Sequence, residues 1–186
     1  MEKFILLVKA NGKVWFSGAL ALMLLTGGIV LSSGECLKTK SAPFGIVSLE
    51  LAWNDDYAQA LREEWSDAPC SDGSPVIEKA KQNIFEDFLF LIGYPLFFVV
   101  CIILLDVHTG SGRGVSNFAR WGVYLSIASG LLDAIENIFM FHFLKGSDWP
   151  AFSFGWPATI KFFCVVAVML MIFYFSVKRI LFRITR

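Results

Sequence analysis

The sequence predicts an all-α membrane protein, a four-helix transmembrane bundle with an extracytoplasmic loop cap between the first and second helices. The chain of 186 residues is 56% hydrophobic and only 17% charged. Its mean hydropathy is +0.62, well above that of a soluble domain. The apolar residues gather in four blocks, each long enough for a hydrocarbon core that takes about 20 helical residues to cross. The length suits a single membrane domain, residues 1–186.

The same composition limits the function classes. The formal net charge is zero, so nucleic-acid binding has no electrostatic support. No catalytic nucleophile, metal-ligand set or cofactor pattern is evident along the chain, and we expect no metal and no cofactor. Membrane lipid is the expected partner, with a second membrane protein as a further option.

The first apolar block follows a short basic head that contains Lys3, Lys9 and Lys13. We expect a membrane-anchoring helix over about 14–31. The alternative is a cleaved signal peptide, because a basic start, an apolar run and small residues follow one another in that order. The run is long for a signal peptide and no A-x-A cleavage site is clear, which favours the anchor.

The outer cap, residues 32–83, is the one substantial polar region. After a turn at 42–45, the alternation of apolar and polar residues over 46–53 suits a strand or extended segment, and one helical turn lying on the membrane fits nearly as well. Asn54 is a good N-cap for an amphipathic helix over about 55–65, whose apolar stripe is Ala58, Leu61 and Trp65. We expect this helix to rest on the outer end of the bundle, over the polar cluster described below.

Three further spans follow. The second, about 86–105, continues a helix that starts after Pro75, and Pro95 should kink or locally break it. A glycine-rich connection lies between 106 and 120; its GSGRG sequence lacks the strand and lysine of a phosphate-binding loop, so it reads as a flexible link. Ser116 or Asn117 should cap the third helix, whose span we place at about 119–144. The fourth span, about 157–178, should carry Pro157 in its first turn.

Small residues recur every fourth position on the third span, which lets another helix approach closely. Close packing inside the bundle is favoured over a dimer interface. The residues of this stripe are Gly122, Ser126, Gly130 and Ala134.

The distribution of basic residues predicts the orientation. Lysine and arginine gather at both ends of the chain and in the central connection, while the last short loop has only Lys145. By the positive-inside rule both termini lie in the cytoplasm, and a multi-pass protein of the plasma (inner) membrane is expected. Cys36 and Cys70 then both fall outside, where they could form a disulfide or stay as free thiols.

One polar constellation lies inside the apolar spans. At about 1.5 Å per helical residue, polar side chains from spans two, three and four reach similar depths in the outer half of the membrane. Each intramembrane carboxylate costs roughly 2.5–3.5 kcal/mol on insertion scales, so such groups are usually paired or functional. The candidate ligand or ion-pair cluster is Asp87, Asp133, Glu136, Asn137 and Lys161.

Two interpretations of this cluster compete. In the structural one, Lys161 pairs with Glu136 or Asp87, Asn137 bonds a neighbouring backbone group, and the network fixes the bundle. Three acids against one interior base argue that this is not the whole account, because at least one carboxylate must be protonated, hydrated or reserved for a ligand or cation.

Four stretches of the chain are GIVSLELA (45–52), AQALREEW (58–65), DFLF with a following tyrosine (87–90 and 94) and LLDAIEN (131–137). They resemble an uncharacterised family of small four-span integral membrane proteins, whose members carry similar short motifs in the same order. The resemblance implies the four-span architecture and marks Asp87, Asp133, Glu136 and Asn137 as motif positions. It implies no activity, and Lys161 joins the cluster by depth alone.

The sequence therefore favours a non-enzymatic membrane protein with an outer-leaflet polar site for a lipid headgroup, a small molecule or a cation. The alternatives are a membrane-embedded enzyme that acts on lipid and a purely structural or partner-binding subunit.

Overall fold

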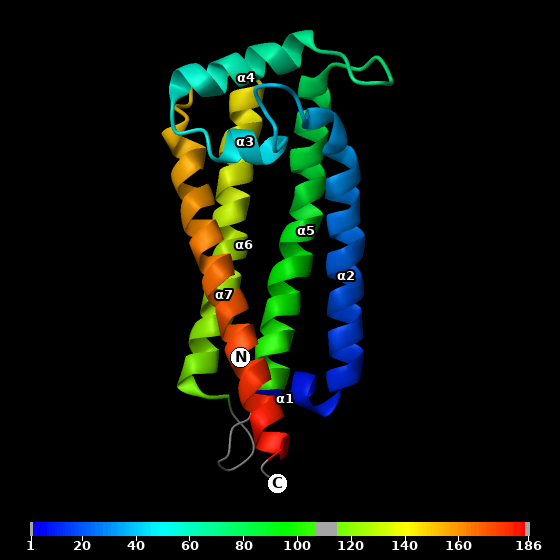
Figure 1. Ribbon diagram of the computed structural model, residues 1–186, viewed down its shortest axis with the longest axis vertical. Helices are drawn as coiled ribbons and strands as arrows, with labels where there is room; N and C mark the ends of the chain where they lie inside the picture. Colours follow the sequence, from blue (N-terminus) through cyan, green and yellow to red (C-terminus); the bar gives the residue numbers. More distant parts are fainter. Residues whose placement is uncertain (1, 107–114, 185–186) are drawn as a thin grey trace.

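The computed structural model describes residues 2–106 and 115–184, and all of their regular structure is helical. Four helices are long and apolar enough to cross a membrane. They are α2 (Gly12–Ser33), α5 (Val76–Leu105), α6 (Asn117–Leu144) and α7 (Phe152–Ile184). Helix α5 packs against α2 on one side and α6 on the other, and α6 packs against α7 (Figure 1). The prediction of an all-α four-span bundle is confirmed.

The starts of two spans follow the local signals in the sequence. Helix α5 begins directly after Pro75, and α6 begins after Ser116, whose hydroxyl accepts a hydrogen bond from the backbone N–H of Ala119 at 3.1 Å. Asp106 accepts hydrogen bonds from the backbone and the hydroxyl of Ser116, at 2.7 and 3.0 Å, so this carboxylate joins the end of α5 to the start of α6. The GSGRG stretch lies outside the described residues.

The two prolines have different outcomes. Helix α5 continues through Pro95, so of the expected kink or local break the break does not occur. Helix α7 begins at Phe152, so Pro157 lies inside the helix and not in its first turn. The earlier start has a packing reason: Ala151 and Phe154 are fully buried in the core beneath the cap, which draws the aromatic loop into helical structure.

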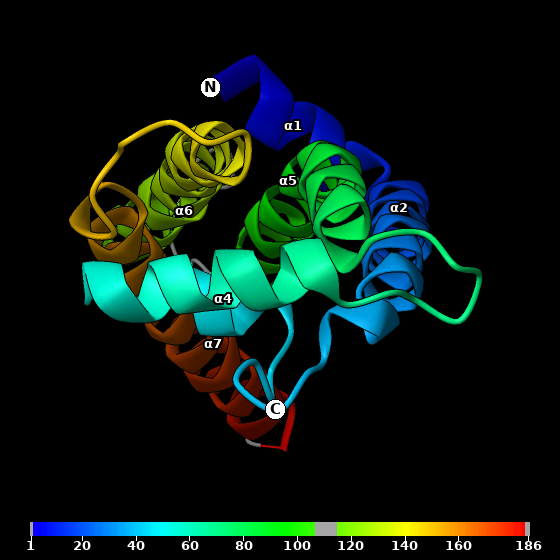
Figure 2. The ribbon, with the colours of Figure 1, turned by 90° about the horizontal axis from the view of Figure 1, so that it is seen from above.

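Helix α4 (Asp55–Asp67) crosses one end of the bundle, as Figures 1 and 2 show. The Asn54 side chain accepts a hydrogen bond from the Tyr57 N–H at 3.1 Å, and the stripe of Ala58, Leu61 and Trp65 is fully buried. The expected amphipathic helix and its cap are confirmed.

Two contacts fasten α4 to the bundle. Asp55 accepts a hydrogen bond from the Ala151 N–H at 2.6 Å, just before α7. Arg62 donates to the carbonyl of Phe143 at 3.2 Å near the end of α6, with its guanidinium 5.1 Å from the centre of the Phe143 ring.

The segment 46–53 is not a strand. It forms the short helix α3 (Ile46–Glu50), which lies between α4 and the membrane-spanning helices (Figure 1). One helical turn satisfies backbone groups locally, because the N–H groups of Leu51 and Ala52 donate to the carbonyls of Val47 and Leu49. A lone strand has no such partner. The helical-turn alternative is therefore correct, and α3, not α4, lies directly over the polar cluster.

The basic head forms a helix that the sequence reading missed, α1 (Glu2–Ala10). Its Ile5 and Val8 are buried at the bundle end opposite the cap, and the Phe4 and Trp15 rings meet edge to face with centroids 5.3 Å apart. Helix α1 and the C-terminal part of α7 both lie at this end (Figure 1).

Small residues set the close helix contacts inside the bundle. A Cβ added to Gly122 would lie 2.7 Å from Ile102 Cδ1 on α5 and 2.9 Å from Met171 Cε on α7. A Cβ on Gly130 would lie 3.0 Å from Pro95 Cγ. At these two positions the small-residue stripe of α6 faces helices of the same chain, which confirms packing within the bundle.

Candidate functional site

Lys161 lies at the centre of a buried network of charges. Its Nζ is 2.8 Å from Glu136 Oε2, 3.0 Å from Asp133 Oδ1 and 3.2 Å from Glu50 Oε2. These carboxylates come from α6 and from α3, while the lysine is on α7. Charges removed from water are costly unless they are paired, and this network pairs them across α3, α6 and α7.

Two hydrogen bonds extend the network to α5. Tyr94 donates its hydroxyl to Asp133 Oδ2 at 3.0 Å, and Asn137 donates its Nδ2 to Asp87 Oδ2 at 2.7 Å. The five residues of the predicted cluster therefore lie together, at the depth expected from their positions along three helices.

The pairing within the cluster differs in part from the predicted one. Lys161 pairs with Glu136, as one alternative had it, but not with Asp87, whose carboxylate instead accepts from Asn137. Asn137 accordingly bonds a side chain and not a backbone group. Asp87 and Lys161 nevertheless line the same cavity.

Two members, Glu50 and Tyr94, were not among the predicted residues. A signal was present for both, because each lies in a stretch that carries the family resemblance, GIVSLELA and DFLF with its following tyrosine. Tyr94 also lies seven positions after Asp87, which places both on one helical face.

Glu136 is the most deeply buried member, with a fully buried side chain. Its contact with Lys161 is an ion pair, and neither of its carboxylate oxygens accepts a hydrogen bond of good geometry from the described residues. Lys161 is thus the one described group that offsets its charge.

A cavity of about 400 Å³ lies beside the network. Helices α2, α3, α5, α6 and α7 all contribute to its wall. The polar lining side chains include Glu50, Asp87, Asp133, Asn137 and Lys161. Most of the remaining lining is aromatic or aliphatic, so the cavity has a polar end and an apolar body.

The residues of α5 give the direction of this cavity. Asn83, Ile84, Asp87, Phe90, Tyr94 and Phe98 line it in sequence order, from the cap toward the middle of the helix. The polar residues Asn83 and Asp87 lie on the cap side of the three aromatic ones. Along α5, the lining therefore changes from polar near the cap to apolar near the middle of the helix. A lipid in the leaflet on the cap side has the same order, from headgroup to chain.

The cavity is partly open. In Figures 1 and 2, α5 lies between α2 and the α6–α7 pair, and the cavity is lined from both sides, by Met23 of α2 and Val165 of α7. At its edge, Leu31 and Phe44 are 76% and 73% exposed. Lys38 is also exposed on this lining, so the edge carries both apolar and charged side chains.

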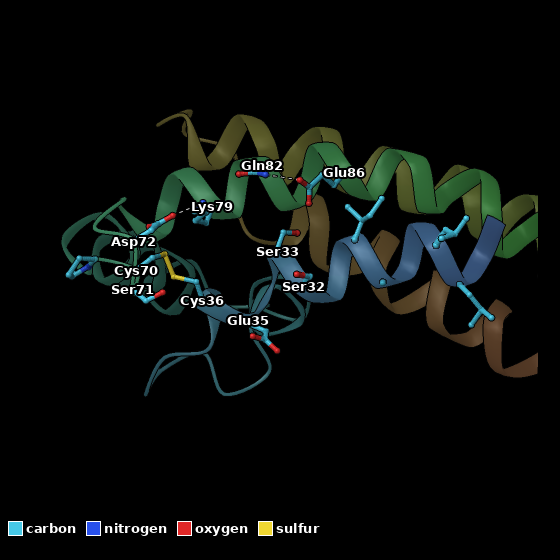
Figure 3. Close-up of a pocket in the computed structure, with 15 residues that line it drawn as sticks. Ser32, Ser33, Glu35, Cys36, Cys70, Ser71, Asp72, Lys79, Gln82 and Glu86 are labelled. Atoms are coloured by element: carbon cyan, nitrogen blue, oxygen red, sulfur yellow. Dashed lines mark hydrogen bonds and ion pairs between the residues drawn. A yellow bond between two sulfur atoms is a disulfide. The ribbon is translucent and has the colours of Figure 1, made fainter. Parts of the chain in front are cut away.

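A second hollow, of about 930 Å³, lies between the cap ends of α2 and α5 (Figure 3). Cys36 and Cys70 lie at disulfide distance on its wall, with Cα atoms 5.7 Å apart. The Ser74 hydroxyl and Lys79, which is 2.9 Å from Asp72, hold the pKa of Asp72 well below its usual range. The charges of this hollow are thus largely paired or exposed.

Among the described residues, no group of three or more histidine, cysteine, aspartate or glutamate side chains has the arrangement to hold a metal ion. Comparison with family models, curated proteins and solved structures finds no match to this chain. The resemblance to the four-span family therefore stays a prediction.

Proposed function

We propose that this protein binds a membrane amphiphile in the cavity between α2, α5 and α7, with the headgroup beside the polar cluster and the chain directed toward the bilayer midplane. The observation that carries the proposal is an apolar cavity that ends at a buried charge network. Ligand sites typically combine apolar walls with a few well-placed polar groups.

Size and access support this proposal. A volume of about 400 Å³ falls within the range of about 300–1,000 Å³ that is usual for small-molecule sites. The apolar rim at Leu31 and Phe44 suits entry from the lipid phase. A structural ion-pair network alone would account for the charges but would not need a cavity beside them.

The proposal includes an orientation in the plasma membrane, with both termini cytoplasmic. Lys3, Lys9, Lys178 and Arg179 lie on the helices that form the end opposite the cap, which favours this end as the cytoplasmic one. The cap, with Cys36 and Cys70, then faces an oxidising compartment where a disulfide can persist. The cavity opens in the outer leaflet.

Native mass spectrometry of the protein extracted from its membrane tests the binding proposal. Val165 lines the cavity, whereas its neighbour Val166 is 54% exposed on the outer face of α7. Val165→Trp fills the cavity and should remove a bound mass that the wild type and Val166→Trp both retain. Melting curves of all three proteins establish that they are folded.

The outcomes separate the function classes. A wild-type protein without a bound mass, or a mass that survives Val165→Trp, contradicts the proposal. Recovery of an amphiphile in chemically altered form during incubation would instead favour the membrane-embedded enzyme. Loss of folding in every variant of the charge network, with no ligand in any, would favour the structural subunit.

A further inference from the structure

The ammonium group of Lys161 is already surrounded by carboxylates of the protein. An ammonium group has three N–H donors, and Lys161 Nζ lies within 3.2 Å of carboxylate oxygens from Glu50, Asp133 and Glu136. Nζ donates hydrogen bonds to Glu50 and Asp133 and forms an ion pair with Glu136, so a phosphate or carboxylate of a ligand would have to compete with three carboxylates for it. To contact Lys161, an anionic headgroup would have to displace one of these carboxylates, which would then be buried without its partner.

The acids, by contrast, outnumber the bases at the polar end of the cavity. Glu50, Asp87 and Asp133 line its wall, and Glu136 lies directly behind them. Lys161 is the one buried basic residue among the described residues there, and the other basic lining residue, Lys38, is exposed at the rim. The formal count at the buried end is four carboxylates to one ammonium.

Asp87 is the acid with the least compensation. Its one side-chain hydrogen bond from the described residues comes from the neutral amide of Asn137, on Oδ2. No described basic side chain forms an ion pair with it. Because Asp87 lines the cavity, its carboxylate is available to a ligand that brings a positive charge and N–H donors.

We propose that the occupant of the cavity is a single-chain amphiphile with a primary amine headgroup, and that Asp87 binds the amine. This inference rests on the proposed function and names its ligand class. The amine would supply the missing positive charge, and its N–H groups match a wall that offers mainly acceptors. A single-chain amphiphile is the simplest ligand that places one amine at the polar residues and one apolar chain along the aromatic wall.

Binding of three probes with the same chain tests the headgroup. Dodecylamine, dodecanol and dodecyl phosphate are titrated into the full-length protein in nanodiscs of uncharged, zwitterionic lipid at neutral pH. Dodecylamine should bind at least about tenfold more tightly than dodecanol, because hydrogen bonds to charged groups are stronger than neutral ones. Dodecyl phosphate should bind more weakly than either. This comparison uses the wild-type protein and depends on no variant.

Two variants then locate the amine. Asp87→Asn should reduce dodecylamine binding to the level of dodecanol and leave dodecanol binding unchanged. Glu86→Gln is the matched control, because Glu86 lines the other hollow and accepts a hydrogen bond from Gln82; it should leave both affinities unchanged (Figure 3).

The results that overturn this inference differ from those that overturn the proposed function. Equal affinity for dodecylamine and dodecanol, or preference for dodecyl phosphate, refutes the amine headgroup. In that case, binding that Val165→Trp abolishes still supports the proposal that the cavity binds an amphiphile. If no probe shows binding that Val165→Trp abolishes, both fail.

Discussion

Glu50 Oε2 lies 3.2 Å from Lys161 Nζ, although 111 positions separate the two residues in the chain. Glu50 ends the short cap helix α3, and Lys161 is inside the span of α7. This ion pair makes the cap and the membrane cluster one unit. Helix α3, which covers the cavity, is therefore held in place by Lys161, which also lines the cavity wall.

Removal of the central lysine should destabilise the bundle strongly. Lys161→Met leaves buried carboxylates without their partner, and breaking a buried pair in this way costs about 3–5 kcal/mol. The melting temperature in detergent should fall far below that of Lys40→Met, a matched change at an exposed lysine of the cap. Equal melting temperatures for the two variants would show that the network contributes nothing to stability.

Loss of the Glu50 charge should loosen the cap locally. Glu50→Gln keeps the size of the side chain and weakens its bond to Lys161, so the amides of α3 should exchange hydrogen for deuterium faster. The spans should keep their protection, because Asp133 and Glu136 still hold Lys161. Glu63→Gln, at an exposed position on α4, is the control. Unchanged exchange in α3 would mean that the ion pair does not hold this helix.

The contact between α2 and α5 requires a glycine at position 93. A Cβ there would lie 2.8 Å from Thr26 Oγ1 and 3.1 Å from Met23 Cα, so Gly93→Ala must push the two helices apart. Overpacking of this kind costs about 1–3 kcal/mol, which thermal unfolding would detect. Gly28→Ala adds the same methyl group on α2 where no atom lies within 4 Å, and it should leave stability nearly unchanged. Similar losses in both variants would refute the close contact.

The cysteine pairing predicts a count of reactive thiols. In denaturant without reductant, only Cys101 and Cys164 should react with an alkylating reagent; after reduction, all four cysteines should react. Intact-mass spectrometry distinguishes these states. Reduction should also lower the free energy of unfolding by about 2–4 kcal/mol, because the bridge closes a long loop. Four reactive thiols before reduction would exclude the bridge.

The sequence predicted the spans well because each is a long apolar block, and that signal depends little on the rest of the chain. Local chemistry was equally informative at Asn54 and Ser116, where each helix start is set by a side chain and a backbone N–H three positions later. The start of α7 was misplaced because the buried positions of Ala151 and Phe154 depend on the cap above them.

The candidate site was predicted only in part. Depth along the helices brought Lys161 together with Asp133 and Glu136, since depth follows from residue count alone. Glu50 was missed because it lies in a region rich in surface acids, and its burial depends on the docking of α3. The bond between Asn137 and Asp87 depends on how each helix is rotated about its axis, which hydropathy does not report.

Photocrosslinking in the membrane tests the central claim most directly. A dodecylamine that carries a diazirine near the end of its chain is added to membranes that contain the protein, and the labelled peptides are sequenced. The account predicts labels on the cavity face, at Phe98 of α5 and Val165 of α7. Labels confined to lipid-facing residues such as Ile92 and Phe163, which are 61% and 72% exposed, would contradict it.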